Sequence, residues 1–199
     1  MSEIIIKNES LFTKSSNHFS TLIIFIISAL FAILVGSGLY GYGNDFYSSY
    51  YRANLDWGGL FDRLGYILAT ASINGVHIGV QIVTFVLTLS AGFLIREHIK
   101  FKQSYSFIFF IFLYIIAIHT WPIIMSTSNA MRQGLAMSFI FLAFVAGSRK
   151  SYFWMIIFSI LATLNHNSGL VLAAVAIFAP IAKQFLENFS PVNKVLLNF

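Results

Sequence analysis

The chain has 199 residues, of which 58% are hydrophobic and only 10% are charged, and its formal net charge is +5. Soluble domains contain about 25% charged residues, so this composition excludes an ordinary soluble protein. It predicts an all-α fold, a polytopic transmembrane helical bundle. Cysteine is absent, which excludes disulfides and thiolate metal sites.

The basic residues lie in short clusters beside apolar runs, as the positive-inside rule describes for membrane proteins. The positive charge therefore indicates membrane orientation, and no nucleic-acid partner is expected. The five histidines show no metal-ligand spacing, and no nucleotide-binding loop is present. Neither a metal nor a cofactor is expected.

The first part of the chain predicts one span followed by a long loop. Residues 1–18 are polar and are expected to form a cytoplasmic tail, whereas residues 19–40 are long enough to cross a bilayer, which takes about 20 residues. A signal peptide is the alternative, but its apolar core would be shorter and no A-x-A site follows. Residues 41–75 are expected to form an outer loop. Within it, residues 64–73 predict a short amphipathic or re-entrant helix.

Three further spans follow in a helical domain expected over residues 19–183. They are predicted at residues 76–95, at residues 105–124 and at residues 130–147. Pro122 lies near the end of the second of these, and a turn is expected over residues 126–129.

The Lys and Arg residues orient these spans. Loops rich in basic residues stay in the cytoplasm, which places residues 96–102 and 148–151 inside. The N-terminus is then inside as well, and residues 41–75 and 126–129 lie outside.

The last apolar stretch, residues 152–182, is interrupted by the polar residues 165–169. It is too long for one span and short for two, so two helices broken at the polar residues are predicted. Broken helices are tolerated at membrane depth where protein or a wet cavity surrounds them. The whole chain is therefore expected to have about five to six spans, with one or more broken or re-entrant helices. Residues 184–199 are expected to begin an unfinished segment.

Arg132 is the strongest candidate for a functional residue, because an arginine at the centre of a membrane helix costs about 2.5 kcal/mol or more. Asn129, Arg132, Gln133 and Ala136 are spaced so that they would share one helix face. A snorkelling anchor at the helix end is the alternative for Arg132. The neighbouring Asn129 and Gln133 favour a cluster of hydrogen-bond donors.

Other polar residues on the expected outer side have two interpretations each. His166 is either a hydrogen-bonded residue at a helix break or a functional residue, which would accept a proton or donate a hydrogen bond to phosphate. Asp45 is either a solvated loop carboxylate or a base. Tyr47 and its aromatic neighbours are either an interfacial belt or a platform for sugars. His119 is interpreted as structural.

Three motifs follow one another along the chain: G-x-D-x-Y at residues 43–47, R-Q-x-L-A at residues 132–136 and H-x-S at residues 166–168. In this order they resemble the EpsG-like family of bacterial polysaccharide polymerases, relatives of the Wzy O-antigen polymerases. Family members are much longer, so the chain is interpreted as an N-terminal portion. Many relatives have a proline after the acidic residue that corresponds to Asp62, and this chain has none, which puts a role for Asp62 in doubt.

The resemblance implies a multi-pass protein of the bacterial plasma membrane that transfers glycosyl groups on the outer face. The donor would be a growing glycan on undecaprenyl diphosphate, and the acceptor a sugar hydroxyl of another lipid-linked repeat unit. Membrane lipid, a chain-length regulator and a flippase would be its partners. A transporter or flippase of the same glycan, or an inactive truncated product, is the alternative.

The expected roles in that reaction follow from the charge of the leaving group. Arg132 would bind the diphosphate through its guanidinium fork, and Asp45 or His166 would take the acceptor proton. The remaining expected substrate-binding residues are Gln133, Asn129, Arg52, Ser168 and Tyr47.

Overall fold

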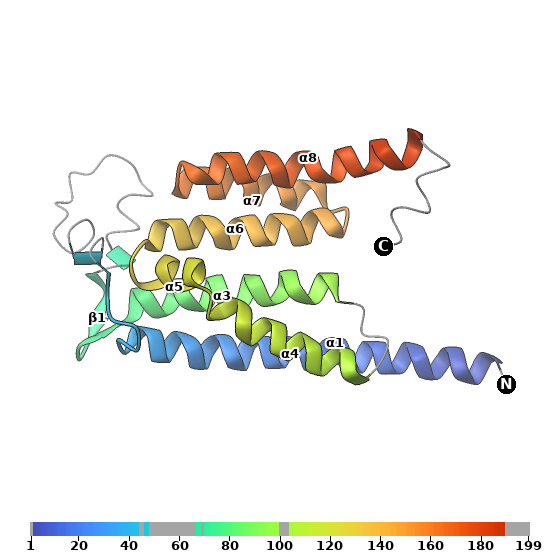
Figure 1. The fold of residues 1–199 in the computed structure, drawn as a ribbon, viewed down its shortest axis with the longest axis horizontal. Helices are drawn as coiled ribbons and strands as arrows, with labels where there is room; N and C mark the ends of the chain where they lie inside the picture. The colour runs from blue at the N-terminus through green and yellow to red at the C-terminus, as the bar shows by residue number, and fades with distance from the viewer. Residues whose placement is uncertain (1, 44–45, 48–66, 69, 100–103, 190–199) are drawn as a thin grey trace.

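The computed structural model describes residues 2–43, 46–47, 67–68, 70–99 and 104–189. These residues form seven helices and a hairpin of two short strands, which confirms the all-α class. In chain order the elements are α1 (Ser2–Gly36), β1 (Ser72–Ile73), β2 (Val76–His77), α3 (Ile78–His98), α4 (Ser104–Ile118), α5 (Trp121–Ser128), α6 (Met131–Ser148), α7 (Tyr152–Asn165) and α8 (Ser168–Phe189). The long helices run side by side along one axis, whereas the short α5 is bent away from α4 (Figure 1).

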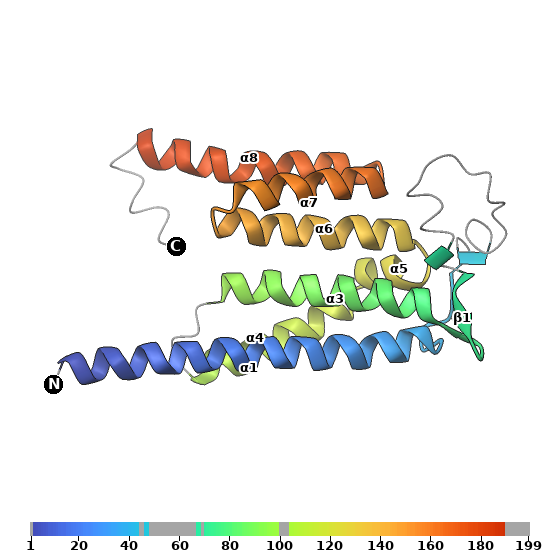
Figure 2. The same ribbon diagram turned by 180° about the vertical axis from the view of Figure 1, so that it is seen from behind.

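The two ends of the bundle are named after arginines of the α6 segment. The Arg132 end holds the end of α1, the β-hairpin, α5, the start of α6 and the turn between α7 and α8. The Arg149 end holds the end of α3, the start of α4 and the turn between α6 and α7. The view from behind shows the start of α1 and the end of α8 on the Arg149 side (Figure 2).

Several helices are long and apolar enough to cross a membrane, as a multi-pass membrane protein requires. Three qualify individually: His18–Gly36 within α1, all of α3 and all of α6. α4 and α5 together make a fourth candidate, bent by 55°. The apolar helices α7 and Ser168–Pro180 within α8 are shorter. The expected spans at 19–40, 76–95 and 130–147 are thus confirmed in position.

The span expected over residues 105–124 is instead a bent pair of helices. α4 ends at Ile118, and α5 starts at Trp121 with Pro122 in its first turn. Proline is favoured there because the first backbone N–H groups of a helix have no intrahelical partner. α5 then continues through Ser128, so the turn expected over residues 126–129 is wrong for all but the last residue.

The short helix expected over residues 64–73 is wrong for its final residues. Ser72 pairs with His77 and Ile73 with Val76 in an antiparallel hairpin. Asn74 and Gly75 form its turn with φ of 51° and 78°. Asn-Gly is the preferred pair for such a turn because both central residues need positive φ.

Polar and apolar contacts join the helices of the first half. The Tyr114 hydroxyl lies 2.7 Å from Ser28 Oγ and donates to the Thr88 carbonyl at 3.1 Å. These bonds connect α4 with α1 and α3, and they satisfy a hydroxyl that lipid would leave without a partner. Apolar residues of the same helices pack around Tyr114, among them Ile24 and Phe110.

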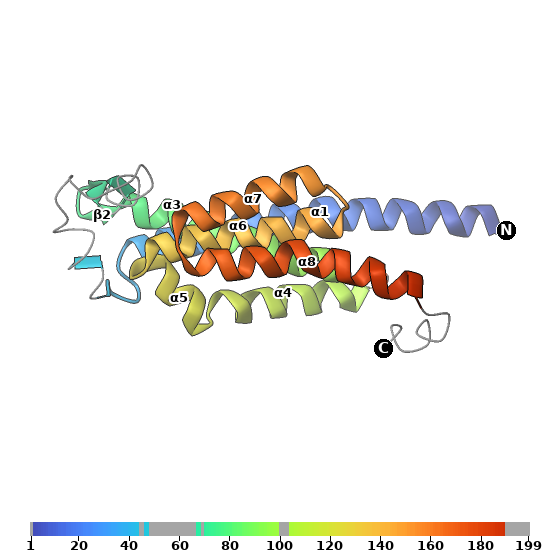
Figure 3. The ribbon, with the colours of Figure 1, turned by 90° about the horizontal axis from the view of Figure 1, so that it is seen from above.

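The second half packs through small residues. Ala143, Ala146, Ala162, Ala173 and Ala176 are buried between α6, α7 and α8. Small side chains let membrane helices approach closely. α6 lies between α3 and the α7–α8 pair (Figure 1). The view from above shows α4 and α5 on the opposite face from α7 (Figure 3).

Candidate functional site

Arg132 connects the start of α6 to the break between α7 and α8. It lies in the first turn of α6 and is half-buried. Its Nε donates to the Asn165 carbonyl at 3.2 Å. The last carbonyls of a helix have no partner within the helix, so Arg132 satisfies one such group of α7. Asn165 is itself buried, and its Nδ2 donates to the Leu161 carbonyl at 2.8 Å.

His166 and Ser168 form a local hydrogen-bonded pair at the expected break, which lies between Asn165 and Ser168 and is confirmed. The Ser168 N–H donates to His166 Nδ1 at 3.2 Å, and Ser168 Oγ lies 2.7 Å from the same nitrogen. An Nδ1 that accepts the amide hydrogen bond is unprotonated. Nε2 therefore carries the hydrogen of the neutral ring and is a donor.

The surroundings of His166 keep its ring neutral. Partial burial lowers the pKa of His166 from its ordinary value of 6.5, and the positive charge of Arg132 lowers it further. Both effects disfavour the charged imidazolium. The electrostatic effect of Arg132 also shows that the two expected site residues lie near each other.

The first loop contacts the residues that precede α6. Gly43 N–H donates to the Ser128 carbonyl at 3.4 Å. A Cβ on Gly43 would lie 2.0 Å from Asn129 Oδ1, so only glycine permits this approach. Phe46 is fully buried in a cluster that includes Met131 of α6. The first motif element therefore contacts residues just before the second, and Arg132 of the second contacts Asn165, which directly precedes the third. Asp45 and Arg52 lie outside the described residues.

Asn129 does not share a helix face with Arg132 as expected. It is the C-cap of α5, because α6 begins only at Met131. Asn129 is nonetheless 8% exposed and lies between the first loop and α6. Gln133 is half-buried on α6. A Cβ on Gly134 would lie 2.1 Å from the Ser126 carbonyl oxygen, so α5 packs tightly on α6.

Aromatic rings surround the described part of the first loop. Tyr42 stacks on Phe46 with ring centroids 4.9 Å apart, and Tyr47 meets Phe46 edge-on at 5.3 Å. Burial, followed by the effect of Tyr47, raises the pKa of Tyr42 above 10.0, so its neutral hydroxyl donates to the Gly36 carbonyl at 2.8 Å. Tyr47 is 49% exposed and remains accessible to a ligand.

His77 belongs to this group but was not predicted. Its ring lies 4.5 Å from Tyr42 and 4.9 Å from Phe46, and its buried Nδ1 has no hydrogen-bond partner in the described part of the chain. The sequence signal was a histidine at the start of the second span, which was predicted over residues 76–95. Spacing along the chain does not reveal its contact with the first loop. Among the described residues no three His, Asp or Glu side chains gather as a metal site would require.

A sequence model of the EpsG family matches residues 18–197. The chain belongs to the EpsG family. The match includes all three motif elements, and the resemblance inferred from them is confirmed. Membership in the EpsG family implies a role in exopolysaccharide biosynthesis. Comparisons with curated proteins and with solved structures gave no significant match.

Proposed function

We propose that this protein polymerises lipid-linked oligosaccharide repeat units by glycosyl transfer from an undecaprenyl-diphosphate donor on the outer face of the plasma membrane. The main support is that contacts at the Arg132 end link the first loop, the start of α6 and the α7–α8 break. The first loop contacts Asn129 through Gly43, and Arg132 contacts the α7–α8 break through Asn165. Family membership gives the class of product.

The proposed topology has six spans, with the Arg132 end outside and the Arg149 end in the cytoplasm. α1, α3, the α4–α5 pair and α6 are four of them, and α7 and α8 complete the bundle. The basic residues beside α3 and α6 support this orientation. Cysteine at position 48 should react with an impermeant thiol reagent from outside, and cysteine at position 148 should not. Labelling of both positions from outside contradicts the topology.

Charge develops on the leaving group in the proposed reaction. An acceptor hydroxyl oxygen attacks the anomeric carbon of the donor, the bond from that carbon to the diphosphate oxygen breaks, and the hydroxyl proton passes to a base. The diphosphate leaves with an added negative charge. Fixed donors aimed at such charge lower the barrier. The fork of Arg132 suits two phosphate oxygens at once, and its contact with Asn165 fixes its direction.

The two candidate proton acceptors differ in their suitability. His166 has Nδ1 engaged by Ser168 and presents a donor at Nε2, so we assign it a hydrogen bond to phosphate or acceptor. Asp45, which follows the Gly43 contact in sequence, is then the base. Five residues complete the proposed substrate site: Asn129, Gln133, Arg52, Ser168 and Tyr47.

The decisive experiment compares Arg132→Lys and Arg132→Gln in a deletion strain, with polymer length and membrane abundance measured together. If Arg132 binds the diphosphate, Lys loses most polymer, because a point charge cannot replace the bidentate fork. If Arg132 only anchors the helix, Lys serves equally, since lysine snorkels as readily. Lys150→Gln removes a cation at the Arg149 end and serves as the control. Full-length polymer from Arg132→Lys contradicts the proposed site.

A transporter of the same glycan would also use a basic site with broken helices. Polymerisation by purified protein in detergent, supplied only with lipid-linked repeat units, separates the two functions. No membrane barrier exists there, so a transporter yields no polymer. Longer glycans that depend on Arg132 support the polymerase.

A further inference from the structure

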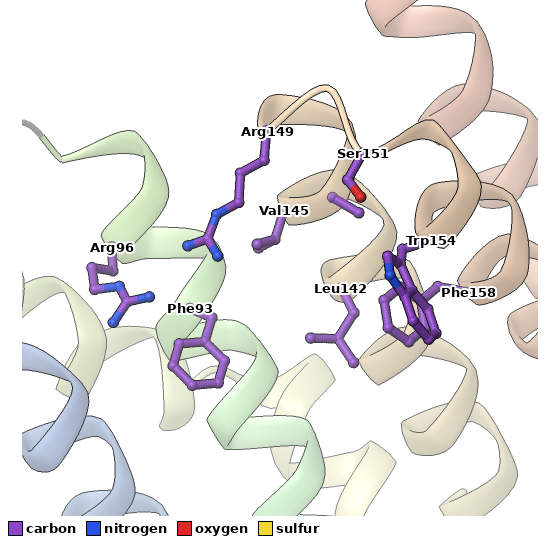
Figure 4. Close-up of a pocket in the computed structure, with 9 residues that line it drawn as sticks. Phe93, Arg96, Leu142, Val145, Arg149, Ser151, Trp154 and Phe158 are labelled. Carbon is purple, nitrogen blue, oxygen red and sulfur yellow. The ribbon is translucent and has the colours of Figure 1, made fainter.

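A cavity of about 320 Å³ opens at the Arg149 end between α3, α6 and α7 (Figure 4). This volume is within the roughly 300–1,000 Å³ of small-molecule sites. Leu142, the lining residue of α6 that is nearest to Arg132 in sequence, lies ten residues further along the helix, which is about 15 Å at 1.5 Å per residue. The cavity is therefore distinct from the candidate site.

Two arginines line the cavity, and none of the described residues that line it is acidic. Both guanidinium groups turn toward the same space beside Phe93 (Figure 4). Arg149 donates from Nε and Nη2 to one Glu97 carboxylate oxygen at 2.9 and 2.7 Å. Arg96 donates from Nη1 to Thr21 Oγ1 and lies over the Phe93 ring at 5.0 Å.

Each guanidinium keeps donors for a ligand. Within the described part of the chain, Arg149 Nη1 and the Nε and Nη2 of Arg96 make no hydrogen bond to protein. Arginine N–H groups arranged in this way match the oxygens of a phosphate. The cavity is thus suited to an anion at the level where the helices end.

The opposite wall of the cavity is apolar. Leu142 of α6 and Trp154 and Phe158 of α7 face it. Trp154 is 53% exposed near the start of its helix, as expected of a tryptophan at a membrane interface. A free phosphate would leave this wall unused, whereas an amphiphile would cover it.

We propose that this cavity binds an anionic phospholipid of the surrounding membrane. Its phosphate lies between Arg96 and Arg149, and an acyl chain lies along Leu142, Trp154 and Phe158. Basic pockets between membrane helices bind lipid head groups in this way. The lipid contacts both α3 and the α6–α7 pair, so it stabilises the fold by preferential binding to the folded protein.

The direct test measures quenching of Trp154 by brominated lipids. The variant Trp57→Phe/Trp121→Phe leaves Trp154 as the single tryptophan. In phosphatidylcholine vesicles, added brominated phosphatidylglycerol should quench it more strongly than the same amount of brominated phosphatidylcholine. Arg96→Gln should remove the excess quenching. Equal quenching by the two lipids overturns the proposal.

Thermal unfolding supplies the second measurement and the controls. Phosphatidylglycerol should raise the Tm of the wild type and of Lys150→Gln, whose altered cation does not line the cavity. Glu97→Gln should keep the increase, because it breaks the ion pair but retains both arginines. Arg96→Lys should reduce the increase in Tm, since lysine keeps the positive charge but lacks the guanidinium fork.

Inorganic phosphate in phosphatidylcholine vesicles is the arm that separates a lipid from a free anion. It should leave the Tm unchanged. An equal increase in Tm with inorganic phosphate overturns the lipid assignment. If Lys150→Gln loses as much of the Tm response to phosphatidylglycerol as Arg96→Lys does, the lipid responds to general surface charge, and the proposed site is overturned.

Discussion

The two ends of α6 each have an arginine, and the two arginines have different contacts. Arg132 is half-buried and donates to the main-chain carbonyl of Asn165, which directs its fork. Arg149 is 51% exposed and pairs with the Glu97 carboxylate, which compensates its charge. The residue type is therefore a poor guide to function in this protein. The contacts distinguish the two residues, because a main-chain carbonyl orients Arg132, whereas Arg149 forms an ion pair.

The largest expected effect tests the chemistry proposed for the Arg132 end. Asp45→Asn should abolish polymer while the protein stays in the membrane, because the amide cannot accept the hydroxyl proton. His166→Gln should leave residual activity. Polymer length and membrane abundance are measured for both variants.

His119→Gln is the matched control for His166. His119 also lies at a helix end, where its Nδ1 bonds the Ile115 carbonyl at 2.8 Å, and it packs on Phe31. It should retain full activity. Residual activity in Asp45→Asn together with none in His166→Gln would transfer the base to His166.

The next largest effect concerns the fit of the first loop on Asn129. Gly43→Ala places a Cβ 2.0 Å from Asn129 Oδ1 and should lower polymerisation several-fold. Such overpacking costs about 1–3 kcal/mol. Gly41→Ala is the control, because no atom of the described residues beyond its chain neighbours lies within 4 Å of its Cβ, although its φ is positive. An equal loss of polymerisation in the two variants would indicate that the conformation of the loop, and not its contact with Asn129, causes the loss.

A smaller effect is expected for the buried Tyr114 hydroxyl, which lies in the middle of the bundle, away from both ends. Tyr114→Phe removes the hydroxyl that joins α1, α3 and α4 and should lower the free energy of unfolding by about 0.6–1.7 kcal/mol, the range for hydrogen bonds between membrane helices. Denaturant titration in detergent micelles measures it. Tyr152→Phe, at an exposed position, is the control. Equal stability in the two variants would contradict this role of the Tyr114 hydroxyl.

At the Arg149 end the effect of the ion pair on stability should be smaller still. Glu97→Gln should change the free energy of unfolding by less than about 1 kcal/mol, because exposed pairs are solvated and screened. The change should shrink further in high salt. A larger loss of unfolding free energy that does not depend on salt would mean that the ion pair is a main stabilising contact. The two ends would then not differ as described.

The final prediction concerns the titration of His166, measured by NMR. Its pKa should lie below 6.5, and Arg132→Gln should move it upward by removing one of the two causes. Folding lowers this pKa, so the stability linked to it is fully present above pH 6.5 and is lost as the pH falls through the folded value. An unchanged pKa in Arg132→Gln would mean that the two groups do not interact.

Lipid explains why much of this fold is predictable from sequence. Because a bilayer sets the length and composition of a span, the apolar runs located α3, α6 and the apolar part of α1, His18–Gly36, within a few residues. The polar residues 165–169 located the break between α7 and α8, because they interrupt an otherwise apolar stretch. The order of the three motifs, combined with alternating spans, also predicted that they would meet at one end.

Contacts between distant segments explain what was missed. Pro122 was assigned to the end of a span, although proline equally starts a helix. The spacing also placed Asn129 on one helix face with Arg132, whereas in the structure Asn129 is the C-cap of α5. The packing of Gly43 on Asn129 and of His77 on Tyr42 joins segments separated by long stretches of chain. No local pattern specifies such pairs.

The length of α7 has a mechanical consequence for the membrane. Its 14 residues extend only about 21 Å, against a hydrocarbon core of about 30 Å. A short apolar helix is accommodated by local thinning of the bilayer. In the topology proposed above, α7 crosses the membrane, so the leaflet that faces His166 would bend inward beside it and the head groups would descend toward the polar break. The proposed lipid-diphosphate donor, diffusing in that leaflet, would then reach the Arg132 end without leaving the lipid phase.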